Sequence, residues 1–139
     1  MKLQNRLVLL AILLTFVFGI VGFVERYVRK NYPLAVVENL RVAYYKNQEK
    51  VFTNEIPLPV SRLAACGELH VPHPQSLIIG ILDVNSNEYV GHNDATEVIP
   101  PGSFCVNLLL DTAYIQSGNY RLEVMDRHEV IAEKLFVVK

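Results

Sequence analysis

The chain lacks the sequence signatures on which most enzymes and cofactor-binding proteins rely. No serine lies in a G-x-S-x-G motif, and neither of the two cysteines has a local signature that pairs it with a base. His92 with Asp94, and His128 with Asp126, are only neighbours on expected turns. The chain also has no tryptophan, which weakens the case for sugar binding. We therefore predict no enzyme activity and no cofactor.

Clustered positive charge is also missing from most of the chain. Residues 1–30 hold five basic side chains and one acidic, whereas residues 31–139 hold eight basic and thirteen acidic. A surface that binds phosphates needs clustered lysine and arginine, so we expect no nucleic-acid partner. The early basic residues instead flank an apolar run, where lipid headgroups would lie.

What the chain does contain is one long apolar run from Leu7 to Val24. These eighteen residues carry no charge, and Thr15 is the only polar side chain among them. A buried helix of a soluble protein would show a polar face at the 3.6-residue period, and this run shows none. We therefore predict a transmembrane helix at 7–24, preceded by a cytoplasmic tail at 1–6 and followed by a juxtamembrane linker at 25–33.

A cleaved secretory signal is the alternative interpretation of the same run. Lys2 and Arg6 would form its basic region, and Leu7–Phe18 its hydrophobic region of twelve residues. The positions around Gly19 and Gly22 offer only a poor small-residue cleavage site, so we favour a retained signal anchor. Basic residues on both sides leave the orientation open, but the short basic tail favours a cytoplasmic amino terminus and an extracytoplasmic domain.

Residues 34–139 show short apolar runs broken by turn residues, the pattern of an all-β antiparallel sandwich. The runs predict strands at 35–45, 50–56, 60–71, 76–84, 88–91, 96–99, 103–111, 118–125 and 129–138. In the clearest alternation, Tyr120, Leu122 and Val124 are expected to point inward and Arg121, Glu123 and Met125 outward.

Two features sharpen the fold prediction. In the segment 115–120 an apolar residue and a glycine precede Tyr120, which resembles the tyrosine corner of Greek-key sandwiches, where the phenol bonds to upstream backbone. The stretch Ser76–Asn93, followed by Pro101–Phe104 and Ser117–Leu122, resembles the immunoglobulin-like sandwiches of bacterial envelope proteins. Within that group it is similar to the carbohydrate-binding domain that ends some O-antigen ABC exporters. This resemblance implies an immunoglobulin-like fold and a carbohydrate ligand.

The two cysteines, Cys66 and Cys105, lie in expected strands far apart in sequence. They suit a disulfide if the domain faces an oxidising compartment. Cys105 alternates against Phe104 and Val106, however, so it would point away from the core while Cys66 points inward. Two separate thiols are therefore the alternative.

Two weak metal patterns also occur. Cys66, His70 and His73 offer zinc-like ligands, but strand spacing puts the histidines on opposite faces, and two exposed loop histidines are the simpler interpretation. A second pattern echoes the spacing of calcium loops, but it has a glutamate where the turn needs glycine, and an asparagine-rich hairpin turn explains it as well. Its residues are Asp83, Asn85, Asn87 and Asp94. We expect no bound metal.

Our leading hypothesis is a single-pass membrane protein whose extracytoplasmic sandwich, periplasmic or on the cell surface, is an interaction or structural component of a cell-envelope assembly. The segment Val130–Val138 is the candidate edge strand for binding by strand addition. The second hypothesis is a ligand-binding module, with carbohydrate as the ligand. Its candidate ligand face consists of Tyr44, Tyr45, Tyr89 and Tyr114. An enzyme without a sequence signature is the third hypothesis.

Overall fold

A computed structural model describes residues 3–31, 33–71, 76–113 and 115–139 of the chain. The chain divides into two compact units, with the boundary between Leu34 and Ala35. The first unit contains one helix, α1 (Leu3–Asn31), and the second contains all the strands. The two units are described separately below.

Helix α1 contains a span from Leu3 to Tyr27 that is long and apolar enough to cross a membrane, and none of it is buried in the protein. A signal sequence near an amino terminus would have the same properties. The helix is longer than the predicted 7–24, because it takes in most of the expected tail and most of the expected linker at 25–33. No glycine or proline occurs between Val24 and Asn31, so nothing in the sequence stops the helix there. Tyr32, just before Pro33, lies outside the described residues.

Nine strands lie in the described part of the second unit. They are β1 (Val36–Lys46), β2 (Glu49–Phe52), β3 (Glu55–Ile56), β4 (Leu63–His70), β5 (Ile78–Asp83), β6 (Glu88–His92), β7 (Gly102–Leu110), β8 (Gly118–Asp126) and β9 (Glu129–Val138). The strands form one hydrogen-bonded sheet in the order β2-β1-β4-β7-β6-β5-β8-β9-β3. All pairings are antiparallel except that of β3 with β9, which is parallel.

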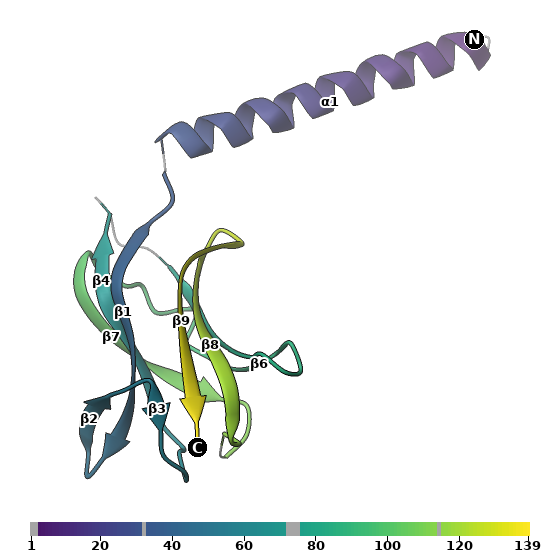
Figure 1. The fold of residues 1–139 in the computed structure, drawn as a ribbon. Helices are drawn as coiled ribbons and strands as arrows, with labels where there is room; N and C mark the ends of the chain where they lie inside the picture. Colours follow the sequence, from purple (N-terminus) through teal and green to yellow (C-terminus); the bar gives the residue numbers. More distant parts are fainter. Residues whose placement is uncertain (1–2, 32, 72–75, 114) are drawn as a thin grey trace. The chain divides into compact units, whose positions relative to one another are not determined.

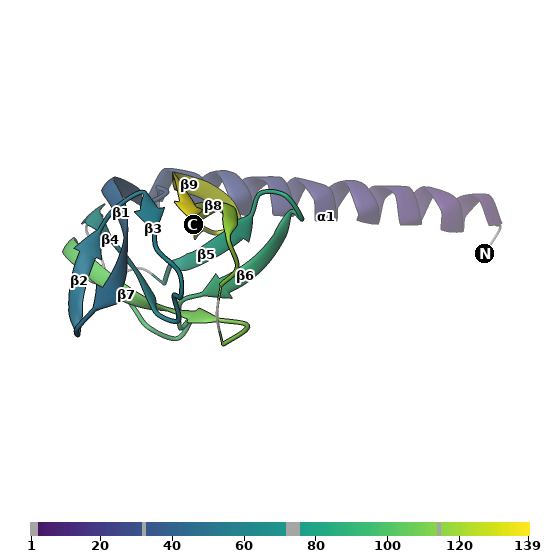
Figure 2. The same cartoon turned by 60° about the horizontal axis from the view of Figure 1, so that its bottom comes forward.

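This sheet curls into a half-barrel. Figures 1 and 2 show β1, β2, β4 and β7 on one side of the unit and β5, β6, β8 and β9 on the other. The two sides are joined through a short β6–β7 pairing, at Gly91 with Leu110 and His92 with Leu109. The all-β prediction is therefore confirmed, whereas the division into two separate sandwich layers stays a prediction.

The core fills the concave face of the half-barrel. Alternate residues of β8 point into it, because successive side chains of a strand lie on opposite faces. Tyr120, Leu122 and Val124 are buried there, as the alternation predicted, together with Ile79 and Ile81 of β5. Glu123, predicted to point to solvent, lies on the opposite face but is also buried. Its environment is described with the candidate site.

Two predicted strands are wrong. Residues 96–99 form no strand: a turn lies at residues 95–96, and Ile99 is a single bridge residue. The Asp94 carboxylate accepts hydrogen bonds from the Thr96 backbone N–H at 2.9 Å and the Thr96 hydroxyl at 2.6 Å. Such local side-chain bonds compete with strand pairing. The predicted strand 50–56 is divided into β2 and β3, with the Thr53 hydroxyl accepting the Glu55 N–H between them.

The tyrosine corner is confirmed. The Tyr120 hydroxyl donates a hydrogen bond of 2.7 Å to the carbonyl of Gln116, four residues upstream. The ring is buried and lies 5.6 Å from the ring of Phe136 on β9. The corner therefore ties the loop before β8 to the core.

Replacing Tyr120 with phenylalanine is expected to lower the free energy of unfolding of the β unit by about 1 kcal/mol, because the Gln116 carbonyl loses its partner while ring packing is kept. Denaturant unfolding of the detergent-solubilised protein measures the loss. Tyr44→Phe is the control, since the Tyr44 hydroxyl makes no hydrogen bond within the described residues. Equal effects from the two substitutions would contradict the role of the corner.

Candidate functional site

The candidate site lies on the convex side of the sheet, where β5, β8 and β9 run side by side. The strand register determines which residues are cross-strand neighbours there. Glu123 lies opposite Gly80 on β5 and opposite Glu133 on β9, and Arg121 lies opposite Leu135 on β9. We call this surface the β8 face. Its members are Ile78, Tyr89, Arg121, Glu123, Met125, Val130, Glu133 and Leu135.

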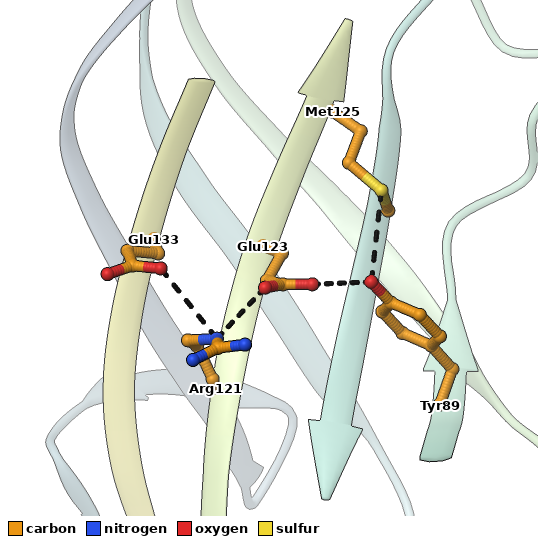
Figure 3. A network of polar contacts seen from close by, with 5 residues as sticks. All are labelled: Tyr89, Arg121, Glu123, Met125 and Glu133. Carbon is orange, nitrogen blue, oxygen red and sulfur yellow. Dashed lines mark hydrogen bonds and ion pairs between the residues drawn. The ribbon is translucent and has the colours of Figure 1, made fainter. Parts of the chain in front are cut away.

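A buried carboxylate lies at the centre of the β8 face. Glu123 is only 4% exposed, and both of its oxygens accept hydrogen bonds (Figure 3). Arg121 Nε donates to Oε2 at 2.9 Å, and the Tyr89 hydroxyl donates to Oε1 at 2.5 Å. A buried charge needs such partners, because an unpaired one would be strongly destabilising. Glu133 lies farther from Arg121 Nε, at 3.7 Å, and is exposed.

Gly80 sets the position of the Tyr89 ring. A Cβ atom at residue 80 would lie 2.9 Å from Cδ1 and 3.0 Å from Cε1 of that ring, closer than real contacts allow. The ring therefore covers the backbone of β5, and its hydroxyl reaches across β5 to Glu123 on β8 (Figure 3). The Sδ atom of Met125 lies 4.0 Å from the same hydroxyl.

The hydrogen bond to Glu123 raises the pKa of Tyr89 above its usual 10.0, and partial burial and the negative charge of Glu123 add to the shift. A raised pKa means that neutral Tyr89 stabilises the folded state. This stabilisation is fully present below pH 10.0 and is lost as the pH rises through the pKa of the folded state.

An ultraviolet titration of the wild type minus that of Tyr89→Phe is therefore expected to show a phenol that ionises above pH 10.0. Glu123→Gln is the matched variant, because it keeps the shape of the side chain and removes its charge. In that background the titration of Tyr89 is expected to shift back to lower pH. A Tyr89 titration at its usual pH in the wild type would contradict the geometry.

The structure does not bring together the three predicted ligand-face tyrosines that it describes. Tyr44 is partly buried and packs against the core. Neighbouring residues of a strand point to opposite sides of a sheet. Tyr45 points outward from β1, where its hydroxyl donates to Asn107 Oδ1 at 2.6 Å and Arg62 lies 4.3 Å above its ring. Tyr89 belongs to the other half of the sheet, and Tyr114 lies outside the described residues. Carbohydrate binding stays a prediction.

Cys66 and Cys105 form a disulfide between β4 and β7. The two residues are direct cross-strand partners, with their Cα atoms 4.1 Å apart. Both side chains point to the convex side, where Cys66 is buried and Cys105 is exposed. The burial of Cys66 and the exposure of Cys105 are as expected, although the two are cross-strand partners, and the bonded sulfur of Cys66 is not free for a zinc ion.

Of the two histidines in the zinc pattern, only His70 is among the described residues, and it lies beside two glutamates. His70 Nε2 is 3.2 Å from Glu38 Oε2 and 3.9 Å from Glu68 Oε2, and His73 lies outside the described residues. The three ligand atoms lie within 4.8 Å of one another, close enough for a metal ion. All three side chains are about half exposed, and Asn39 donates to Glu68 at 3.2 Å, so the cluster is already satisfied by polar contacts.

The residues of the calcium pattern serve two separate turns. The Asp83 carboxylate accepts the backbone N–H of Asn85 at 2.9 Å, and Asn87 adopts φ 58°, as the hairpin interpretation requires. Asp94 instead accepts hydrogen bonds from the hydroxyl and the backbone N–H of Thr96 within its own turn, and these bonds lower the pKa of that carboxylate.

The two local histidine–aspartate pairs are not formed as hydrogen-bonded pairs. His92 contacts the Asn93 carbonyl through Nδ1 at 2.8 Å and lies 4.0 Å from Asp111. Asp126 is buried and accepts the backbone N–H of Ala35 at 2.9 Å, so it holds the start of the β unit against the end of β8.

No protein-family model matches the chain, and no curated protein matches it. Among solved structures it is similar to a crystal structure of an immunoglobulin-like protein from Pseudomonas aeruginosa. The two share 15% sequence identity over 76% of this chain and 97% of that chain, with a TM-score of 0.46. A likeness this distant assigns no family, and the fold described above rests on the strand order itself. The resemblance to O-antigen exporters stays a prediction.

Proposed function

We propose that the protein is a single-pass membrane protein whose β unit is immunoglobulin-like, lies outside the cytoplasm and binds other proteins of the cell envelope. The observation that carries this proposal is the combination of an unburied apolar helix with a separate, fully folded β unit. A helix that buries no apolar surface inside the protein gains stability only where lipid or another partner covers it.

The disulfide supports the extracytoplasmic location. Disulfides persist in oxidising compartments and are rare in the cytosol, where thiols are kept reduced. Cys66 and Cys105 are held opposite each other by strand pairing, so an oxidising compartment would join them without rearranging the fold.

The hydrogen bonds among the polar side chains of the β8 face support a binding role rather than catalysis. Both oxygens of the buried Glu123 accept hydrogen bonds from neighbouring side chains, so this carboxylate serves to order the face. On one side β9 pairs with β8 along its whole length, and on the other side it pairs with β3 at Val137 and Val138 alone. The strand order of the sheet ends at β2 and β3, but within the described residues the rest of Val130–Val138 has no strand on its second side, so this segment stays the candidate edge for strand addition.

A cysteine-accessibility assay in intact cells tests the proposed location. A membrane-impermeant maleimide is applied to the full-length protein before and after treatment with a membrane-impermeant reductant. We expect labelling of the exposed Cys105 only after reduction, and already in intact cells. Labelling that requires cell lysis would place the β unit in the cytoplasm and refute the proposal.

A further inference from the structure

We propose that the β8 face binds a segment of another protein that presents a lysine or arginine flanked by apolar side chains. This inference rests on the proposed function and specifies the partner of the β unit. Two properties of the face carry it: an exposed apolar rim, and an excess of one negative charge beside the ion pair of Arg121 with the buried Glu123.

The pairing of the strands places exposed apolar residues around the charged centre of the β8 face, and these residues form the apolar rim. Ile78 lies opposite Met125 and Met125 opposite Val130, while Leu135 lies opposite Arg121. Ile78, Tyr89, Val130 and Leu135 are between 47% and 65% exposed. Exposed apolar side chains that adjoin one another on one face, rather than scattered singly, are typical of protein interaction sites.

The charges of the face favour a cationic side chain of the partner. Arg121 is the only basic residue of the face, and the buried Glu123 compensates its charge at 2.9 Å. Glu133 is a second carboxylate, lies 3.7 Å from the same nitrogen and is 59% exposed at its side chain. The formal charge of the face is therefore −1. The whole of residues 31–139 is acidic as well, with thirteen acidic and eight basic side chains.

The centre of the face is already ordered before a partner arrives. The Tyr89 ring is seated over Gly80, and its hydroxyl is bonded to Glu123, which is bonded in turn to Arg121. A fixed aromatic side chain loses little conformational freedom on binding, which is a property of residues that dominate interface energetics. A cationic side chain of the partner beside Glu133, with apolar side chains of the partner on the rim, would complete the contact.

Site-specific photo-crosslinking of the full-length protein in its own cells tests this inference. A benzoylphenylalanine replaces Leu135 in the β8 face, and a matched protein carries it at Leu109, which is 55% exposed on β7. We expect a discrete protein adduct from position 135 that position 109 does not give. Mass spectrometry of that adduct is expected to show a crosslinked segment with a lysine or arginine among apolar residues.

Charge reversal at Glu133 tests whether the adduct depends on the negative charge of the β8 face. We expect Glu133→Lys to reduce the adduct from position 135 by about tenfold or more, because like charges across an interface are strongly disfavoured. Glu133→Gln is expected to reduce it less. Lys46→Glu, which changes an exposed charge on β1 instead, is expected to leave the yield unchanged.

Four outcomes overturn the inference: no adduct beyond that of position 109, an adduct insensitive to Glu133→Lys, a crosslinked segment without a basic residue, or an adduct with glycan or lipid. The accessibility assay with Cys66 and Cys105 is run on the same cells. If that assay places the β unit outside the cytoplasm and any of these outcomes occurs, the partner inference fails while the proposed location stands.

Discussion

A protein in which Leu13 and Leu14 are both replaced by arginine is expected to be lost from the membrane fraction. Leucine favours insertion by about 0.3 to 0.6 kcal/mol at the centre of a membrane helix, whereas arginine opposes it by about 2.5 to 3.5 kcal/mol. The two replacements together therefore cost about 6 to 8 kcal/mol, which matches the whole favourable contribution that we estimate for the apolar run, about 4 to 8 kcal/mol. Extraction at alkaline pH separates inserted from peripheral protein and measures the result.

Leu13→Ile with Leu14→Ile is the matched control for this experiment. It keeps two large apolar side chains at the same exposed positions of α1, so the protein is expected to stay in the membrane pellet. Retention of the double-arginine protein in the pellet after alkaline extraction would show that α1 is not what attaches the chain.

Removing the disulfide is expected to lower the free energy of unfolding of the β unit by about 4 kcal/mol in the chain-entropy model, because the bond closes a loop between residues 39 apart in sequence. The double variant Cys66→Ala with Cys105→Ala avoids placing an unbonded polar group at the buried position of Cys66. Denaturant unfolding of the oxidised wild type and of this variant measures the difference.

A reductant provides the control for the disulfide prediction. It is expected to destabilise the wild type by a similar amount and to leave the double alanine variant unchanged, since that variant has no cysteines. A difference below about 1 kcal/mol between wild type and variant would contradict the expected contribution, which is typically about 2 to 4 kcal/mol.

The parts of the fold that sequence alone predicted are those set by local periodicity. The alternation of Tyr120, Leu122 and Val124 needed only the two-residue period of a strand, and the structure buries all three. The tyrosine corner was predictable because the hydroxyl and its acceptor, Gln116, lie only four residues apart. The strand predicted at 96–99 failed for an equally local reason, the carboxylate of Asp94 bonding to Thr96.

The centre of the candidate site could not be predicted in this way. Glu123 occupies an outward position of a regular strand, so periodicity assigns it to solvent. Its burial depends on Tyr89, which is 34 residues away and reaches it over the backbone of Gly80. A glycine within a strand is a signal of close approach, but it does not reveal which side chain approaches. The same limit applied to Tyr44 and Tyr45, whose neighbouring positions in sequence place them on opposite faces.

The central claim, that α1 holds the β unit at a membrane, is tested most directly by following the helix in the mature protein. The chain is tagged after Lys139, expressed in cells and extracted at alkaline pH. Its gel mobility is then compared with that of a version beginning at Ala35. We predict a membrane-pellet protein that migrates above the shorter version and yields peptides from 7–24. A soluble product that migrates with the shorter version would show that the helix is a cleaved signal and would contradict the account.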